Sequence, residues 1–361
     1  MMQPGWKACG LLAVVVILLQ GAALLRPSPC IGRLAPELGR SNESATSFAK
    51  SKDDRVDKQD DRVDCCSKSK QSLLAERICV SPSATPMRIP SATEAEEFLA
   101  KTTFQNHIIW DLVPGKVQLN GNTKVALELG ERALSAALTN ETAKGKEDLQ
   151  AMDIGTVNGC VAFELERHGV KTVYAVDIMP PTHFGFQQLH KLLSSQVTFV
   201  RTRGYELASL FEHNSFDLIV MSGVLYHLRH PIVMIDVLWL LLKVGAVAAI
   251  ETAITETLQL AQLPPANLSM ESYNWVKFIQ YYAHTNPEGR VTYDRTNKFF
   301  PSMDALVEFF SDSGFEVLWQ KDLITRGHLL VRKTSTRRFQ KTGYSISDQL
   351  QVALQDPIPC A

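Results

Sequence analysis

Apolar runs and helical patterns alternate along most of the chain after residue 148. Short apolar runs predict strands at 149–154, 171–177, 197–202, 216–222, 245–252, 315–320 and 327–332. Apolar positions at helical spacing predict helices at 160–168, 184–193, 231–242 and 302–313. Strands that alternate with helices predict an α/β fold with a doubly wound, mostly parallel seven-stranded sheet. The last two strands are joined by the short segment KDLITRG and are expected to form an antiparallel hairpin.

The same pattern divides the chain into parts. Residues 27–92 lack sustained periodicity and are rich in Ser, Lys and Asp, so we expect a solvated, disordered stem there. The expected parts are a membrane anchor or signal peptide at 1–26, the stem at 27–92, a helical and extended cap at 93–148, the main domain at 149–333 with an insertion at 253–299, and a tail at 334–361.

Two further helices are predicted outside the alternating region, and a third in the insertion. Thr93 precedes acidic residues and is expected to cap a helix, and 123–138 is amphipathic. In the insertion, Trp275, Phe278 and Tyr282 would share one helical face. That helix is either a lid over a ligand site or an ordinary packed helix.

The N-terminus carries an uncharged run of eighteen residues, Ala8 to Leu25, between Lys7 and Arg26. This length lies between a signal-peptide core and a membrane span. We expect an uncleaved single-pass anchor, with a signal peptide or an organelle presequence as alternatives. Lys7 favours a cytosolic N-terminus and a main domain in the lumen of the secretory pathway. Three sequons, at Asn42, Asn140 and Asn267, permit this location, and Asn42 and Asn140 could be glycosylated there.

Composition narrows the function classes. The net charge is −1, which does not suggest a nucleic-acid-binding surface over the whole protein. The seven cysteines follow no metal-ligand spacing, so no metal site is expected. The adjacent pair Cys65 and Cys66 is expected to be exposed thiols, with palmitoylation or a disulfide as alternatives.

The segment MDIGTVNG, Met152 to Gly159, is a strand end followed by a glycine turn and a helix. Such turns bind nucleotide-like ligands at the carboxyl edge of a sheet. An acid, Asp153, precedes the first glycine, Gly155, and a second acid, Asp177, ends the next strand. A carboxylate at Asp153 would repel a pyrophosphate but suits a cationic amino-acid sulfonium. The loop therefore indicates S-adenosylmethionine rather than NAD.

Five blocks of sequence resemble one family in its order: DIGTVNGCVAFELERHG, AVDI, FDLIVMSGVLYHLRHP, IET and NKFFPSMDALVEFFSDSGFEV. The chain is similar to the tRNA wobble-uridine carboxymethyltransferase and its relatives among the class I S-adenosylmethionine-dependent methyltransferases. The resemblance covers roughly Trp110 to Lys333. It implies group transfer from S-adenosylmethionine or from its carboxylated form.

The resemblance implies roles for residues of the first two strand ends. Asp153 and Gly155, in the loop closed by Gly159, would contact the methionine part of the cofactor. Asp177, with Ile178 and Met179 behind it, would hold the ribose and lie at the edge of the adenine.

It also implies roles for residues further along the chain. Tyr205 and Glu206 would flank the adenine, and Ser222 would lie beneath the sulfonium. Tyr226 and Arg326 match positions that grip the extra carboxylate of carboxy-S-adenosylmethionine in the tRNA enzyme. The family's upstream lysine and tryptophan have no assignable match here, and Val157 stands where a loop glycine is usual.

The predicted function is methyl transfer from ordinary S-adenosylmethionine to an unidentified hydroxyl-bearing acceptor, of small-molecule or glycan type. Tyr226 and His227, and less directly His230, are candidates to take the acceptor's proton. The alternatives are a tRNA carboxymethyltransferase that uses the carboxylated cofactor and a non-catalytic, membrane-tethered binding protein. An NAD-dependent oxidoreductase would need a third loop glycine and a Tyr-x-x-x-Lys pair, which the segment after Tyr226 does not supply.

Overall fold

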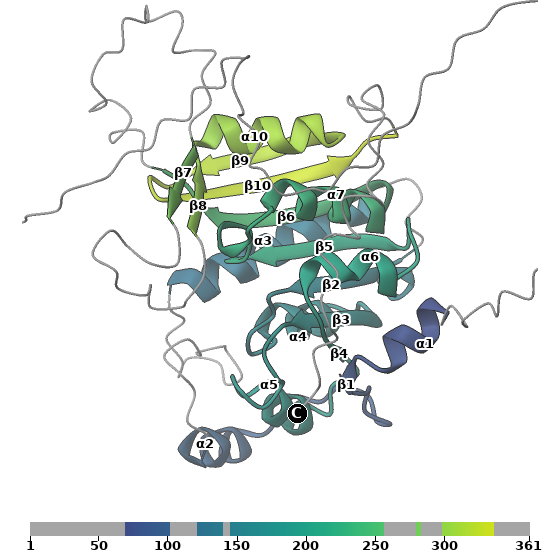
Figure 1. Cartoon of the computed structure of the whole chain (residues 1–361). Coiled ribbons are helices and arrows are strands. Elements are labelled where there is room, and N and C mark those ends of the chain that lie inside the picture. The colour runs from purple at the N-terminus through teal and green to yellow at the C-terminus, as the bar shows by residue number, and fades with distance from the viewer. Residues whose placement is uncertain (1–68, 102–120, 140–144, 256–278, 283–297, 336–361) are drawn as a thin grey trace, which may run out of the picture. The chain divides into compact units, whose positions relative to one another are not determined.

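The computed structural model describes residues 69–101, 121–139, 145–255, 279–282 and 298–335 (Figure 1). These residues build a mixed eight-stranded sheet, a separate two-stranded sheet and surrounding helices. The strands are β1 Ile78–Val80, β2 Gln150–Ile154, β3 Thr172–Asp177, β4 Thr198–Arg201, β5 Phe216–Ser222, β6 Leu242–Ala253, β7 Ile279–Tyr282, β8 Lys298–Pro301, β9 Phe315–Asp322 and β10 Arg326–Lys333. The α-helices are α1 Lys70–Ala75, α2 Ala92–Lys101, α3 Gly121–Leu138, α4 Cys160–Arg167, α5 Phe186–Leu193, α6 Leu207–Leu210, α7 Pro231–Leu241 and α10 Met303–Asp312.

The order of strands in the large sheet is β1-β4-β3-β2-β5-β6-β10-β9. Strands β4, β3, β2, β5 and β6 run parallel, whereas β10 lies antiparallel between β6 and β9. All seven predicted strands are present, and the predicted antiparallel hairpin is confirmed as β9 and β10. The chain adds β3 and β4 on one side of β2 and then adds β5 and β6 on the other side. At such a reversal of strand order the carboxyl ends of the strands open a crevice, here beside the glycine turn.

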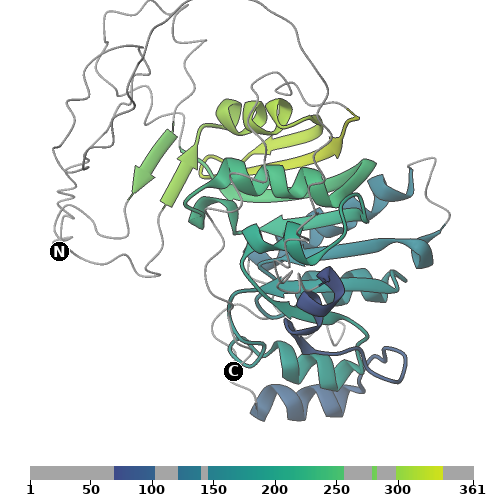
Figure 2. The ribbon, with the colours of Figure 1, turned by 45° about the vertical axis from the view of Figure 1, so that its right-hand side comes forward.

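Helices cover both faces of the sheet (Figures 1 and 2). Alternate residues of β5 belong to different cores: Ile219 and Met221 pack with residues of α6, α7 and α10, whereas Leu218 and Val220 pack with residues of α3, α4 and α5. Burial on both faces explains why the strand sequence FDLIVM is almost continuously apolar.

The prediction of a disordered stem at 27–92 is wrong for residues 69–92, the part of it that the structure describes. Residues 70–75 form α1, and 78–80 form β1, which pairs antiparallel with β4 through Ile78 and Val200. Lys70 also donates to the carbonyl oxygen of Phe211 over 2.8 Å. The sheet therefore has an eighth strand, and a strand of three residues is too short to leave a readable alternation.

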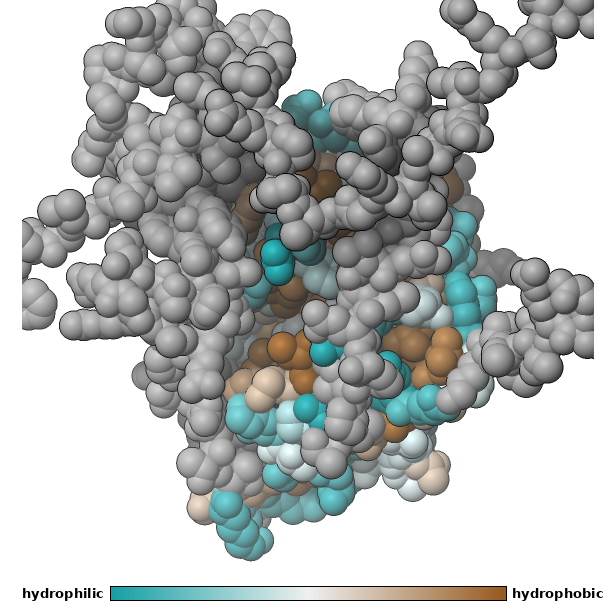
Figure 3. Space-filling model, viewed as in Figure 1, coloured by the Kyte–Doolittle hydropathy of each residue, from teal (hydrophilic) through white to brown (hydrophobic). Residues whose placement is uncertain are grey.

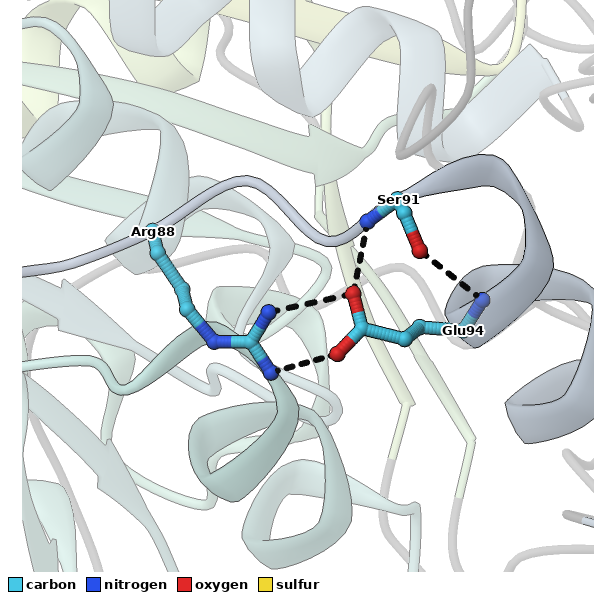
Figure 4. Close-up of polar contacts among 3 residues, drawn as sticks. All are labelled: Arg88, Ser91 and Glu94. Atoms are coloured by element: carbon cyan, nitrogen blue, oxygen red, sulfur yellow. Dashed lines mark hydrogen bonds and ion pairs between the residues drawn. The ribbon is translucent and has the colours of Figure 1, made fainter.

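Ser91, not Thr93, caps α2 (Figure 4). The Glu94 amide donates to the Ser91 hydroxyl over 3.3 Å, and the Ser91 amide donates to the Glu94 carboxylate over 2.8 Å. This reciprocal pair is a capping box, in which the capping residue lies three positions before the acid. Arg88 holds both oxygens of Glu94 and, as the main cause, lowers the pKa of this carboxyl to about 2.

The insertion differs from the predicted helix where it is described. Residues 279–282 are strand β7, paired antiparallel with β8 from Ile279 opposite Pro301 to Tyr282 opposite Lys298. Three of the four residues of β7, IQYY, are β-branched or aromatic, which suits a paired strand better than a helix. Trp275 and Phe278 lie outside the described residues.

The N-terminal segment 1–26, the stem up to residue 68 and the tail after residue 335 also lie outside the described residues. Within the described ranges, no helix combines the length and apolar character that a membrane span requires. The predicted anchor stays a prediction.

Candidate functional site

A cavity of about 560 Å³ runs along the carboxyl ends of the parallel strands. Its size falls within the roughly 300–1,000 Å³ typical of small-molecule sites. It extends from residues after β3 and β4 at one end to residues of β5, β6 and β10 at the other. Its charged and polar lining side chains are Thr123, Asp153, Thr156, Asn158, Asp177, Thr202, Ser222, Tyr226, His227, Glu251 and Arg326.

Gly155 and Gly159 are required by the backbone conformation and packing of the loop. Gly155 has φ +76°, and a Cβ there would lie 2.2 Å from a methyl carbon of Val224. Gly159 has φ +90°, and a Cβ there would lie 2.5 Å from the ring of Phe163. Positive φ favours glycine at both positions, and only Gly155 belongs to the cavity lining.

Asp177, at the end of β3, is fixed by the loop opposite it. Its two carboxylate oxygens accept hydrogen bonds of 2.9 Å from the amides of Val157 and Met179. Burial raises the pKa of Asp177, and these amide hydrogen bonds oppose that rise. Each carboxylate oxygen can accept a further hydrogen bond, so Asp177 can still bind two hydroxyls of a ligand in the cavity.

Asp153, at the end of β2, lies deeper in the cavity wall and is 3% exposed. Its carboxylate accepts a hydrogen bond of 2.6 Å from the Thr156 hydroxyl. Burial raises the pKa of Asp153 to about 7, against the opposing effect of this hydrogen bond. A ligand cation in the cavity would restore the charged form of the carboxyl.

Ile178 and Met179 line the cavity beside Asp177, as the resemblance implies. Ile178 is 52% exposed, which is unusual for a large apolar side chain. On the face drawn in Figure 3, apolar residues lie interspersed among polar ones in the described part of the chain. The exposure of Ile178 is explained by its place at the cavity, where a planar apolar ligand group could cover it.

Ser222, Tyr226 and Arg326 meet at the other end of the cavity. The Arg326 guanidinium lies over the Tyr226 ring, 5.1 Å from the ring centroid. Arg326 also donates to Glu251 over 2.9 Å, and the Ser222 hydroxyl donates to the other oxygen of Glu251 over 3.0 Å. The structure thus brings together three predicted residues and adds a carboxylate that the sequence analysis did not identify.

Tyr205 and Glu206 were predicted to flank the adenine, but neither belongs to the cavity lining. The Tyr205 hydroxyl accepts a hydrogen bond of 2.9 Å from the His230 amide. Glu206 is 3% exposed and accepts hydrogen bonds from Thr202 and Arg203. Thr202 and Gly204, from the same turn after β4, line the cavity in their place.

The two candidate histidines lie in different places. His227 lines the cavity, and its ring centroid is 4.0 Å from that of Tyr226. His230 does not line the cavity and precedes α7, whose first residue is Pro231, without a side-chain cap hydrogen bond. Only His227 is placed to meet a ligand.

Other lining residues were missed because their positions depend on the fold. Thr123 and Ala126 come from α3, far from the glycine loop in the sequence, and Val224 and Leu228 come from the turn after β5. A signal for Glu251 was present, since it is the acid in the strand ending IET.

Residues 127–320, more than half of the chain, match the family model described as a methyltransferase domain. The chain belongs to the methyltransferase domain family. The predicted methyltransferase family and the class I methyltransferase fold are thereby confirmed, and S-adenosylmethionine is the cofactor consistent with them.

Individual relatives are distant. A tRNA U34 carboxymethyltransferase from Helicobacter acinonychis (strain Sheeba) is 27% identical over 118 residues, which are 32% of this chain and 45% of the relative. The chain thus spans less than half the length of this curated relative.

Two solved structures are among those to which the chain is similar. An S-adenosylmethionine-dependent methyltransferase from Mesorhizobium loti is 14% identical, and the alignment covers 57% of this chain and 98% of that one with a TM-score of 0.40. The 1,6-didemethyltoxoflavin-N1-methyltransferase from Burkholderia thailandensis, with bound S-adenosylhomocysteine, is 16% identical over 62% of this chain and 95% of that one, with a TM-score of 0.39. The family match, rather than these distant structures, carries the assignment.

Proposed function

We propose that this chain transfers a methyl group from S-adenosylmethionine to a hydroxyl of a small-molecule or glycan-type acceptor. The observation that carries the proposal is Asp177, whose carboxylate is fixed by two loop amides within the cavity and keeps capacity for two hydroxyls. A ribose offers such a pair of hydroxyls. The adenosine would then lie over β3 and β4, the methionine part over β2, and the sulfur over β5.

The residues along the cavity fit this order. Asp153 offers a buried carboxylate for the ammonium group of the methionine part. Ser222 follows one strand further along the sheet, and Tyr226 and Arg326 lie beyond it. The cavity therefore has an acidic region for the cofactor and a mixed aromatic and charged region where an acceptor could enter.

Bound S-adenosylmethionine supplies an electrophilic methyl group, so the chain itself must mainly orient the acceptor. In the proposed transfer, the acceptor oxygen would form a bond to the methyl carbon as the carbon–sulfur bond breaks, and the acceptor hydroxyl would have to release its proton. His227 lines the cavity beside Tyr226 and would take that proton. Tyr226 would help to position the hydroxyl.

Calorimetric titration of the full chain with S-adenosylhomocysteine tests the cofactor site. Asp177→Ala removes the two hydrogen bonds that the ribose hydroxyls would donate to the charged carboxylate, each worth about 1.5–3 kcal/mol. We therefore expect affinity to fall by roughly a hundredfold or more. Asp148→Ala, which removes an exposed carboxylate outside the cavity, is the matched control. Unchanged affinity in the Asp177 variant would place the ribose elsewhere.

Carboxymethyl transfer from carboxy-S-adenosylmethionine is the second candidate. Its support is the contact of Arg326 with Tyr226, two positions that the family resemblance links to the extra carboxylate. The distant relative described as a tRNA U34 carboxymethyltransferase adds weight to this candidate and to a tRNA acceptor. Ordinary S-adenosylmethionine is favoured because Glu251 already pairs with Arg326.

We further propose that the chain is a single-pass membrane protein with its catalytic domain in the lumen of the secretory pathway. Besides the apolar segment 8–25, Cys79 supports this location, because it is disulfide-bonded. Disulfides are typical of oxidising compartments. Endoglycosidase digestion and alkaline carbonate extraction test the proposal, which fails if the protein keeps its mobility and is extracted.

A further inference from the structure

The Glu251 carboxylate, in the cavity wall, joins the side chains of Ser222 and Arg326. Both lie at the end of the cavity where group transfer would take place, which we call the reactive end. The residue is 7% exposed. One of its oxygens accepts a hydrogen bond of 3.0 Å from Ser222, and the other accepts one of 2.9 Å from Arg326. Both carboxylate oxygens are therefore directed by residues that line the cavity.

The register of three strands creates this arrangement. On β5 and β6, Ser222 lies opposite Glu251, and on β10 Arg326 lies opposite Ala253, two residues further along β6. Residues two apart on a strand project to the same face. Glu251 and Arg326 thus reach each other diagonally on the face that borders the cavity.

Arg326 alone would place a positive charge next to the proposed position of the cofactor sulfur. Burial lowers the pKa of the guanidinium, but Glu251 and Tyr226 outweigh that effect, and the net result is a raised pKa. The side chain therefore stays cationic. An uncompensated guanidinium would repel the sulfonium of S-adenosylmethionine but not the neutral sulfur of S-adenosylhomocysteine.

We propose that Glu251 is a charge-balancing positioning residue. It cancels the charge of Arg326 and holds this guanidinium over Tyr226, so that the cavity accepts a cationic cofactor at the end where group transfer takes place. The inference rests on the proposed function, because it requires the cofactor sulfur to lie over β5. It assigns Glu251 to the reactive end and leaves ribose binding to Asp177.

The test is the ratio of the dissociation constants for S-adenosylmethionine and S-adenosylhomocysteine, measured by calorimetry on the full chain. Glu251→Gln keeps the size of the side chain and removes its charge. We expect the dissociation constant for S-adenosylmethionine to rise about tenfold and that for S-adenosylhomocysteine to change less than about twofold. A purely structural role would weaken both ligands by the same factor.

Asp217→Asn is the matched control. Asp217 pairs with Lys243 over 2.7 Å on the same two strands, β5 and β6, but neither residue lines the cavity. Removing this carboxylate also breaks an ion pair between the strands. We expect the ratio of the two dissociation constants to stay at the wild-type value.

Arg326→Gln provides an independent variant if Glu251→Gln does not fold, as judged by near-ultraviolet circular dichroism. It leaves Glu251 with an uncancelled negative charge, so binding of S-adenosylmethionine should tighten relative to S-adenosylhomocysteine. The double variant should return the ratio to the wild-type value. Equal effects on both ligands in the folded variants would overturn the inference. Failure of the wild-type chain to bind S-adenosylhomocysteine would instead overturn the proposed function.

Discussion

The amide of Val157 donates a hydrogen bond to the Asp177 carboxylate over 2.9 Å, although Val157 has a φ of +54°. This left-handed conformation is strained for a β-branched residue. The strain aims the amide at the residue that we propose binds the ribose. Val157 also lines the cavity, so the strained backbone lies within the site rather than at its edge.

Val157→Gly should stabilise the fold, because glycine adopts this φ without steric cost. The strain of a non-glycine residue here is about 1–2 kcal/mol, and the greater freedom of glycine in the unfolded chain offsets about half of it. We expect a net gain of about 0.5–1 kcal/mol in the free energy of unfolding, measured in urea. Val157→Ala, which keeps a Cβ at positive φ, should gain less than the glycine variant. A loss of stability on substitution by glycine would show that the valine packing outweighs the strain.

Asp153 should make cofactor binding depend on pH. Its pKa of about 7 in the free protein lies far above that of an exposed carboxyl, because burial disfavours the charge. The ammonium of the cofactor favours the ionised form, so binding below this pKa must release a proton. Affinity for S-adenosylhomocysteine should fall as pH decreases from 7, by up to about tenfold per unit.

Asp153→Asn is the variant that isolates this effect. It should bind more weakly than the wild type at pH 8 and show little change in affinity between pH 8 and pH 6. Calorimetry in buffers of different ionisation enthalpy would count the released protons. The same pH slope in wild type and variant would assign the proton release to another group.

Gly155→Ala should destabilise the fold, because the new Cβ would approach Val224 to 2.2 Å at a residue with φ +76°. Strain and overpacking together should cost about 2–5 kcal/mol. Gly130→Ala is the matched control. Gly130 lies within α3, and a Cβ there would lie 3.4 Å from a methyl carbon of Val161, which is an ordinary contact distance. That control should be neutral or stabilising by up to about 1 kcal/mol. Thermal unfolding of the two variants compares them directly, and equal effects would contradict the loop geometry.

Arg326→Leu separates the two cofactor forms. We expect the wild-type chain to bind S-adenosylmethionine more tightly than carboxy-S-adenosylmethionine, because Glu251 already neutralises Arg326. The leucine variant should not weaken binding of S-adenosylmethionine. Tighter binding of the carboxylated form by the wild type, lost in the variant, would favour carboxymethyl transfer instead.

The apolar pattern of the chain determined the fold class. Runs such as FDLIVM record burial on both faces of a strand, and Asp177 could be recognised because a residue that ends a parallel strand must lie at the carboxyl edge. The three-residue β1 left no comparable pattern. The predicted helix in the insertion overlapped β7 because aromatic residues three and four positions apart fit a helical face, whereas the pairing with β8 that makes residues 279–282 a strand leaves no mark in the local sequence.

The direction of side chains beyond the strand ends was decided only by the tertiary structure. Tyr205 and Glu206 follow a strand as predicted, yet the turn after β4 directs them to His230 and Thr202 rather than to the cavity. Glu251 and Arg326 are 75 residues apart and meet because β10 pairs antiparallel with β6. Local periodicity carries information on burial. Strand register and turn geometry depend instead on contacts between distant parts of the chain, and it is this register that pairs Glu251 with Arg326 and so sets the charge at the reactive end.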